Sequence, residues 1–288
     1  MDKVIFVTSI DSFLGQNIAK FYLKKKYRVI AYSNYNFNYY SHKNLIIFQN
    51  KQKLKMHLKK FNKLYYFFFT NGIIGSNYKI QKLYKSHISN SNFFLNILKN
   101  LKIKRLIFFS SVDEVGFSNK NINENTNYSP SNKYSIIKLL ARELFEEFCI
   151  KYSKPYTIFR LFLVIGNNQK IPRLFPLIKY HIQNGKKFVI NNPLAYKNFI
   201  HIDDFCNVLD IILKNKMSLN NIYNLASDQN IKLEKLFKLI HNINPLLKFE
   251  KNLNGSLNSQ KASIFKIKKI IGNYKFKNIN QIIKSFEF

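Results

Sequence analysis

Residues 3–15, KVIFVTSIDSFLG, contain the pattern that decides the fold. Lys3–Thr8 is an apolar run that predicts a buried strand, Ser9–Ser12 is a polar turn, and apolar residues then recur at helical spacing to about Lys25. A strand that turns sharply into a helix brings free helix N–H groups to one point. Such a helix N-terminus is where the pyrophosphate of a dinucleotide binds.

The usual glycine fingerprint of that turn is reduced here to one residue, Gly15, at the position that packs the helix against the strand. Ser9 and Ser12 are small enough to permit close approach at a steric cost, while Asp11 is an awkward neighbour for a pyrophosphate. The second strand ends in Tyr32-Ser33-Asn34, which offers neither an acid nor an arginine for the adenosine ribose. The sequence therefore does not choose between NAD and NADP.

Strands and helices alternate outward from this turn. Further strands are predicted at 28–32, 45–48, 64–69, 105–109 and 157–165, with a basic helix after residue 48, a long helix over about 80–101 and another after residue 129. This alternation predicts an α/β fold with a doubly wound parallel sheet of Rossmann type over residues 1–166.

The pattern loosens after Gly166, and residues 167–288 predict a smaller, mixed C-terminal lobe for substrate binding. Helices are expected at 171–184, from 203, and at 233–241, 264–271 and 279–286, with short strands at 188–190, 199–202 and 222–225. No linker or repeat separates the two parts, so we expect them to be interleaved without a sharp boundary.

The net charge of +32 raises the question of nucleic-acid binding. The lysines are scattered, and Lys, Asn, Ile, Phe and Tyr are enriched together, as in an A/T-rich genome, so we do not favour RNA as a partner. Two cysteines without metal spacing predict reduced thiols and no metal site. Short apolar runs and the absence of a signal peptide predict a cytoplasmic protein that does not cross the membrane.

A second informative stretch is SPSNKYSIIKLLARELFEE, residues 129–147. Ser129 as N-cap and Pro130 at the first helical position predict a helix that places Tyr134 and Lys138 on one face. A lysine ammonium beside a phenol lowers the phenol pKa, which makes the tyrosine usable in proton transfer near neutrality. Taken alone, the same spacing also describes an exposed Tyr and Lys on a surface helix.

Six segments in the same order resemble the extended short-chain dehydrogenase/reductases, in particular the NAD-dependent epimerase/dehydratase family that acts on nucleotide sugars. They are VTSIDSFLG, KRLIFFSSVDEVG, PSNKYSIIK, FRLFLVIG, KNFIHIDD and IYNLAS, and they run through nearly the whole chain.

The resemblance implies a role for individual residues. Tyr134 would be the general acid and base, and Lys138 would hold the nicotinamide ribose of NAD or NADP. Lys197, where the family has arginine, and Arg160 would face the substrate, although Arg160, His201 and Asp204 match positions that we expect to be mainly structural. The other expected cofactor contacts are Ser9, Ser12, Phe13, Leu14, Gly15, Ser33 and Thr70.

The resemblance is incomplete after two strands. Val112 takes the place of the family's catalytic Ser or Thr, and Ser111 is the nearest hydroxyl, one residue away. Asp113 and Glu114 resemble the paired acids of nucleotide-sugar 4,6-dehydratases, but they could equally be two acids of a polar loop. Thr70-Asn71-Gly72 replaces the turn that the family has after the fourth strand.

The expected activity is therefore that of an epimerase, dehydratase or reductase acting on a nucleotide sugar by hydride transfer. The alternative is a catalytically impaired protein that keeps the fold and binds a dinucleotide, or serves as a scaffold. Family members pair through two helices per subunit, here about residues 80–101 and 132–148, so we expect a homodimer.

Overall fold

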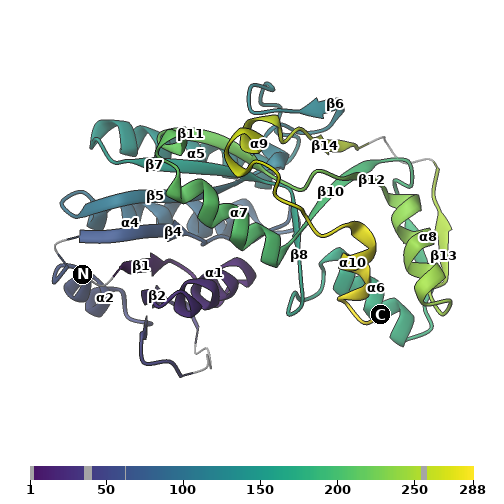
Figure 1. Ribbon diagram of the computed structural model, residues 1–288, viewed down its shortest axis with the longest axis horizontal. Helices are drawn as coiled ribbons and strands as arrows, with labels where there is room; N and C mark the ends of the chain where they lie inside the picture. Colours follow the sequence, from purple (N-terminus) through teal and green to yellow (C-terminus); the bar gives the residue numbers. More distant parts are fainter. Residues whose placement is uncertain (1–2, 36–40, 62, 254–257) are drawn as a thin grey trace. The chain divides into compact units, whose positions relative to one another are not determined.

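The computed structural model describes residues 3–35, 41–61, 63–253 and 258–288. The chain forms two compact units (Figure 1). Unit 1 comprises Met1–Glu114, Pro130–Arg160 and Asn215–Tyr223, and unit 2 comprises Val115–Ser129, Leu161–Lys214 and Asn224–Phe288. The division is thus more interleaved than a single boundary near Gly166, because each unit takes a short segment from within the other's stretch of sequence.

Unit 1 alternates strands and helices along the chain. Its elements are β1 (Val4–Val7), α1 (Phe13–Lys24), β2 (Arg28–Tyr32), β3 (Leu45–Phe48), α2 (Lys51–Leu58), β4 (Lys63–Phe69), α3 (Ile80–Tyr84), a π-helical turn (Lys85–Ser89), α4 (Asn90–Leu98), β5 (Lys102–Ser111), a 3-10 turn (Val112–Glu114), α5 (Lys133–Lys151), β7 (Tyr156–Leu161), a 3-10 turn (Lys216–Ser218) and β11 (Asn221–Leu225).

The strands of unit 1 form a sheet with the order β11-β7-β5-β4-β1-β2-β3, which is seven-stranded within the described residues. Each pair from β5 through β4, β1 and β2 to β3 is parallel. Strand order reverses beside β1, since β2 lies on one side of it and β4 on the other. The predicted Rossmann-type, doubly wound parallel sheet is confirmed (Figure 1).

Alternate residues of the strands pack against helices on opposite faces of the sheet. Phe6, Phe67 and Phe108 join the core that α2, α3, α4 and α5 cover. On the other face, the ring of Tyr22 in α1 packs against Tyr66 and Phe68, with ring centroids 5.9 and 5.5 Å apart. The period-two burial of strand residues therefore places helices on both sides.

The helix that carries Tyr134 begins later than the sequence predicts. Its N-cap is Asn132, whose side chain accepts a hydrogen bond from the backbone N–H of Ser135, and the Ser135 hydroxyl accepts one from the N–H of Asn132. The prediction of Ser129 as N-cap with Pro130 at the first helical position is wrong. A reciprocal capping box at Asn132 satisfies two backbone donors, whereas the predicted start would satisfy one.

Two other predicted elements are divided. The long helix expected over residues 80–101 is two α-helices joined by the π-helical turn Lys85–Ser89. The strand expected over residues 157–165 ends at Leu161, and Leu163–Ile165 pairs elsewhere as β8. Hydrophobic periodicity cannot reveal either break, because both segments remain apolar on their buried faces.

Unit 2 combines short strands with helices. Its elements are β6 (Ser118–Ile122), β8 (Leu163–Ile165), α6 (Leu174–Gln183), β9 (Phe188–Ile190), β10 (Tyr196–His201), α7 (Ile202–Lys214), β12 (Asn230–Lys232), α8 (Leu233–Ile243), β13 (Phe249–Lys251), β14 (Gln260–Ala262), α9 (Phe265–Ile271) and α10 (Ile279–Lys284).

The core of unit 2 lies among α6, α8, α10 and the strands β9 and β10. Phe175, Phe199 and Phe237 are buried there. The expected mixed lobe is observed, although β6, β12, β13 and β14 were not predicted and Ile202 belongs to α7 rather than to a strand. These missed strands have three to five residues each, too few for a periodic pattern to mark them.

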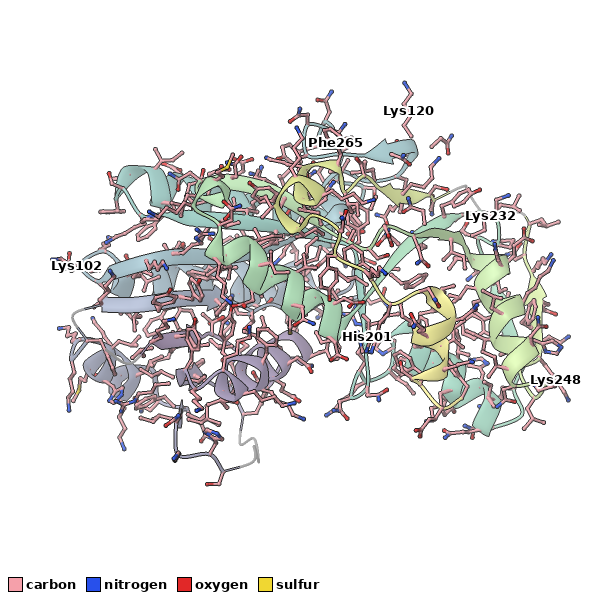
Figure 2. All side chains as sticks on the ribbon, in the orientation of Figure 1. Lys102, Lys120, His201, Lys232, Lys248 and Phe265 are labelled. Atoms are coloured by element: carbon pink, nitrogen blue, oxygen red, sulfur yellow. The ribbon has the colours of Figure 1, made fainter. Side chains whose placement is uncertain are left out.

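The surface lysines are spread over both units. Lys102 on unit 1 and Lys120 and Lys248 on unit 2 are exposed and extend outward from the ribbon (Figure 2). Within the part of the chain that the structure describes, no helix combines the length and apolarity needed to span a bilayer.

Candidate functional site

The candidate site in unit 1 lies at the carboxyl edge of the sheet, where β1 and β4 end side by side. The Thr8 hydroxyl accepts hydrogen bonds from the backbone N–H groups of Thr70 (2.9 Å) and Asn71 (3.1 Å) and donates to Asn71 Oδ1 (3.1 Å). The Ser9 N–H donates to Thr70 Oγ1 (3.1 Å). Thr70, an expected cofactor contact, therefore stabilises the turn after β1 by hydrogen bonding.

The turn between β1 and α1 keeps a tight geometry with a single glycine. Ser12 is the N-cap of α1, and its hydroxyl donates to Ser9 O (2.8 Å) and accepts from Gly15 N (3.0 Å). A Cβ on Gly15 would lie 1.8 Å from Ser9 O. The N-terminal turn of α1 holds no acidic residue, so its positive end stays available to an anion. Phe13 and Leu14 are the first residues of this helix.

Tyr134 and Lys138 lie one helical turn apart near the start of α5, and both side chains are buried. The ammonium of Lys138 sits 4.8 Å from the centre of the Phe108 ring. Burial lowers the pKa of Lys138, and the carboxylate of Glu114 opposes that effect. Both side chains are therefore on the face of α5 that is packed into unit 1, away from solvent.

Glu114 is fully buried and held by several partners. Its carboxylate accepts from the Ser110 hydroxyl and lies 3.5 Å from Arg142 Nε. Burial raises the pKa of Glu114, while Arg142, Lys138 and Arg160 oppose the rise. Arg160, named as a substrate contact, is itself fully buried. Three cations, Arg142, Lys138 and Arg160, thus act on the Glu114 carboxylate inside the protein.

Sequence analysis missed His87, which the structure places beside Tyr134. His87 lies in the π-helical turn, is buried, and packs its ring edge-to-face on Tyr134 with centroids 5.8 Å apart. Its Nε2 is 2.8 Å from Ile73 O. Gly72 makes room for it, because a Cβ there would lie 2.1 Å from His87 Cε1. The unusual Thr70-Asn71-Gly72 turn and this histidine therefore fit each other.

The charge of His87 should make unfolding depend on pH. Burial, helped by the nearby Lys138 ammonium, lowers its pKa to about 3 from an ordinary value of 6.5. Neutral His87 therefore makes its full contribution to the unfolding free energy above pH 6.5, and this contribution is lost as pH falls toward 3. When the pH is lowered from 7 to 5, the unfolding free energy of the native chain should fall by about 2 kcal/mol more than that of His87→Asn.

Urea unfolding of both proteins at pH 7 and pH 5 measures this difference. The exposed His241→Asn serves as the control variant and should follow the native chain. An equal loss in the native chain and in His87→Asn would contradict a neutral, buried His87.

The residues after β5 differ in exposure. Val112 is buried in the 3-10 turn, where the resemblance led us to expect a catalytic hydroxyl. The neighbouring Ser111 is partly exposed, and its hydroxyl accepts from the Asp113 N–H at 3.2 Å. Asp113 is also partly exposed. Of the two acids after β5, only Asp113 is thus within reach of a ligand.

Unit 2 carries the other named substrate residue, Lys197 on β10. Its ammonium donates to Gln260 Oε1 (3.0 Å) and lies 5.3 Å from the centre of the Phe117 ring. His201 and Asp204 lie where β10 meets α7, and Asp204 accepts from the Tyr274 hydroxyl (2.8 Å). Among the described residues, no group of His, Cys, Asp and Glu side chains could hold a metal ion.

The same order of elements and motifs is found in a known family. The model of the NAD dependent epimerase/dehydratase family matches residues 5–226, which is more than half of the chain. The chain belongs to this family. The match covers all of the unit 1 residues discussed above, from the β1–α1 turn to β11, together with Lys197.

Curated members of the NAD dependent epimerase/dehydratase family are distant relatives. A dTDP-D-glucose 4,6-dehydratase of Dictyostelium discoideum is 28% identical over 175 residues, which cover 56% of this chain and 40% of the relative. An uncharacterised UDP-glucose epimerase of Bacillus subtilis is 24% identical over 181 residues, covering 62% and 57%. The matched part thus spans about half the length of these relatives.

Solved structures of the family match over almost their whole length. A UDP-glucuronic acid 4-epimerase from Bacillus cereus, solved with UDP-glucuronic acid and NAD, has a TM-score of 0.86 at 16% identity, with 99% of this chain and 98% of that chain covered. A UDP-N-acetylglucosamine 4-epimerase from Methanobrevibacter ruminantium has a TM-score of 0.83 at 21% identity, with 99% and 98% covered. These likenesses show a shared fold.

Proposed function

We propose that the protein is an NAD-dependent enzyme that epimerises or reduces a nucleotide sugar. The observation that carries this proposal is the buried Tyr134–Lys138 pair. Through His87 and Gly72 it is joined to the Thr70–Gly72 turn, and that turn is hydrogen-bonded to the β1–α1 turn. This chain of contacts supports the proposal, because ligands bind at this edge of the sheet in open α/β folds.

The residues fit a dinucleotide at this edge. The first turn of α1 offers backbone N–H groups and holds no acidic residue, and Gly15 lets the helix approach the strand. Bound NAD would supply a hydride acceptor at its nicotinamide ring. Ser9 and Ser12 would line the pyrophosphate side of the turn, and Lys138 would face the nicotinamide ribose.

Tyr134 would move the proton. Its phenol oxygen would take the proton of a sugar hydroxyl as that carbon is oxidised to a ketone, and would return it when the ketone is reduced. The Lys138 ammonium would favour the phenolate electrostatically. Ser111 would be the hydroxyl nearest to the position that Val112 occupies. Lys197 would contact the substrate phosphates through its ammonium group, which cannot form the two parallel hydrogen bonds of an arginine guanidinium.

Epimerisation or reduction fits the geometry better than dehydration. The resemblance to nucleotide-sugar 4,6-dehydratases would assign the elimination of water to two carboxyl groups, those of Asp113 and Glu114. Glu114 is buried and held by Ser110 and Arg142, so it is a structural partner of Lys138 rather than a group that meets substrate. Asp113 alone would remain for proton transfer.

Two measurements test the proposal. Mass spectrometry of the denatured, purified protein should find NAD released from it. Incubation with UDP-glucose, UDP-glucuronic acid, UDP-N-acetylglucosamine and dTDP-glucose, followed by NMR of the sugar, should then show inversion at one carbon for at least one of them. Absence of inversion with all four sugars, together with no oxidation of NADH when a nucleotide-linked 4-keto sugar is supplied, would reject the enzyme.

A protein that binds a dinucleotide without turnover is the second candidate. Val112, buried where a hydroxyl was expected, favours it, because the substrate hydroxyl would then lack one hydrogen-bonding partner. Bound NAD together with no reaction of any nucleotide sugar would select this candidate.

We also propose that the chain pairs with a second copy through α3 and α5. Ile80 and Tyr84 lie one turn apart on α3, Ile136 and Leu140 one turn apart on α5, and all four are exposed, although the two helices contact each other. Two adjacent helices with apolar outer faces suit a helical dimer interface. The double variant Ile136→Asp/Leu140→Asp should therefore be a monomer where the native chain is a dimer.

Light scattering at several protein concentrations measures the mass. Met217→Asp, which places one aspartate at another exposed apolar residue of unit 1, should remain dimeric. A native chain of monomer mass throughout would contradict the proposed pairing.

A further inference from the structure

The end of β2 lacks the acid that usually binds the adenosine ribose of NAD. The residues there are Tyr32, Ser33 and Asn34. Ser33 is fully buried, and its hydroxyl donates to Tyr35 O (2.7 Å) and accepts from Tyr35 N (3.3 Å). Its role in the protein is thus to close the turn that follows β2, which leaves the ribose of a dinucleotide without a partner from this strand.

A carboxylate reaches the same place from the neighbouring turn. Asp11 lies between β1 and α1, and this turn is tied to the end of β2 by a hydrogen bond from Ile10 N to Tyr32 O (3.0 Å). Burial raises the pKa of the Asp11 carboxyl, while the nearby backbone N–H groups of Asp11 itself and of Asn34 oppose the rise. Its charge is also felt by the Tyr32 phenol, whose pKa it helps to raise. The carboxylate therefore lies near Tyr32 and Asn34, at the end of β2.

One oxygen of this carboxylate is unsatisfied. Asp11 Oδ1 is buried and has no hydrogen-bond partner among the described residues. Burial raises the pKa of Asp11, so the protein holds this group at a cost in its free form. A buried acceptor without a donor calls for an explanation, and a ligand hydroxyl would satisfy it.

We propose that Asp11 is the ribose-binding carboxylate of this protein, supplied by the β1–α1 turn in place of the missing acid at the end of β2. This inference rests on the proposed binding of a dinucleotide. A ribose diol donates two hydrogen bonds, and an ionised carboxylate accepts them strongly. The acid of the phosphate turn would thus have a function, as the acceptor for the hydroxyl groups of the adenosine ribose.

The same residue would select NAD against NADP. A 2′-phosphate carries negative charge and has no donor for Asp11 Oδ1, so it would meet a like charge in a buried place. Neither Ser33 nor Asn34 brings a cation to offset it. We expect the native protein to bind NADH about 100-fold more tightly than NADPH.

The test compares NADH and NADPH binding to the purified chain by fluorescence titration, which requires no turnover. Asp11→Asn keeps the shape and removes the charge, and it should weaken NADH binding about tenfold while NADPH binding improves or stays the same. Asp11→Ser removes the carboxyl group and should change the two affinities in the same way. Glu147→Gln, which deletes one exposed negative charge of unit 1, should leave both affinities unchanged.

Circular dichroism and a thermal melt show whether each variant is folded. If Asp11→Asn is unfolded, Asp11→Ser is compared with the native chain instead. NADH affinity that is unchanged in both variants, or a native chain that binds NADPH as tightly as NADH, would overturn the role of Asp11 while leaving dinucleotide binding intact. A native chain that binds neither nucleotide would overturn the proposed function and this inference together.

Discussion

Tyr134→Phe should reduce turnover of the nucleotide sugar about 1000-fold while leaving NADH affinity within about twofold. The phenol oxygen is the group that would carry the proton, and the ring itself fills a buried place beside His87. Phenylalanine keeps that ring and its packing, so the fold and the dinucleotide turn should be unaffected. The expected change is therefore in kcat, with little change in KM.

Turnover is measured with the sugar identified in the nucleotide-sugar panel, and NADH binding by fluorescence. Tyr152→Phe removes one hydroxyl at the other end of the same helix, α5, and should retain native turnover. Native turnover in Tyr134→Phe would remove the proposed mechanism, whereas loss of NADH binding in that variant would show a structural role for the hydroxyl.

Long apolar runs made the central sheet predictable. LYYFFF and RLIFF are short and rich in aromatic residues, which favours buried strands, and burial on both faces of a parallel sheet removes the need for alternation. The pairing of Tyr134 with Lys138 was predictable for a different reason. Four-residue spacing on a helix fixes a shared face whatever the tertiary context, so an error of three residues in the start of α5 did not disturb it.

His87 could not have been found in the same way. Its contact with Tyr134 depends on the π-helical turn Lys85–Ser89 and on the space that Gly72 leaves. A π turn leaves little trace in hydrophobic periodicity. The only signal in the sequence was the glycine in an unusual turn after β4, which pointed to a close approach but not to the residue that approaches.

Buried charge was equally beyond the sequence. Glu114 was placed with Asp113 as a pair of acids, yet the 3-10 turn Val112–Glu114 sends Glu114 into the protein against Arg142 and leaves Asp113 partly exposed. Glu114 shows that residue type marks a candidate site, while the direction of the side chain decides its chemistry.

Gly15→Ala should abolish tight dinucleotide binding, with an affinity loss of about 100-fold or more, and lower the unfolding free energy by about 3 kcal/mol. The added Cβ would lie 1.8 Å from Ser9 O, which is backbone. That carbonyl is fixed, because it accepts hydrogen bonds from Ser12 N (3.2 Å) and Ser12 Oγ (2.8 Å). Either the turn or the start of α1 must therefore move.

The consequence should reach NAD binding, because the N–H groups of the first turn of α1 hold their positions only through this packing. Chemical denaturation and NADH titration measure the two effects. Lys20→Ala also introduces an alanine, at an exposed position of α1, and should change neither the unfolding free energy nor the NADH affinity. Full NADH affinity in Gly15→Ala would mean that the dinucleotide does not rest on this turn, and the assignment of Ser9–Gly15 as the phosphate site would fall with it.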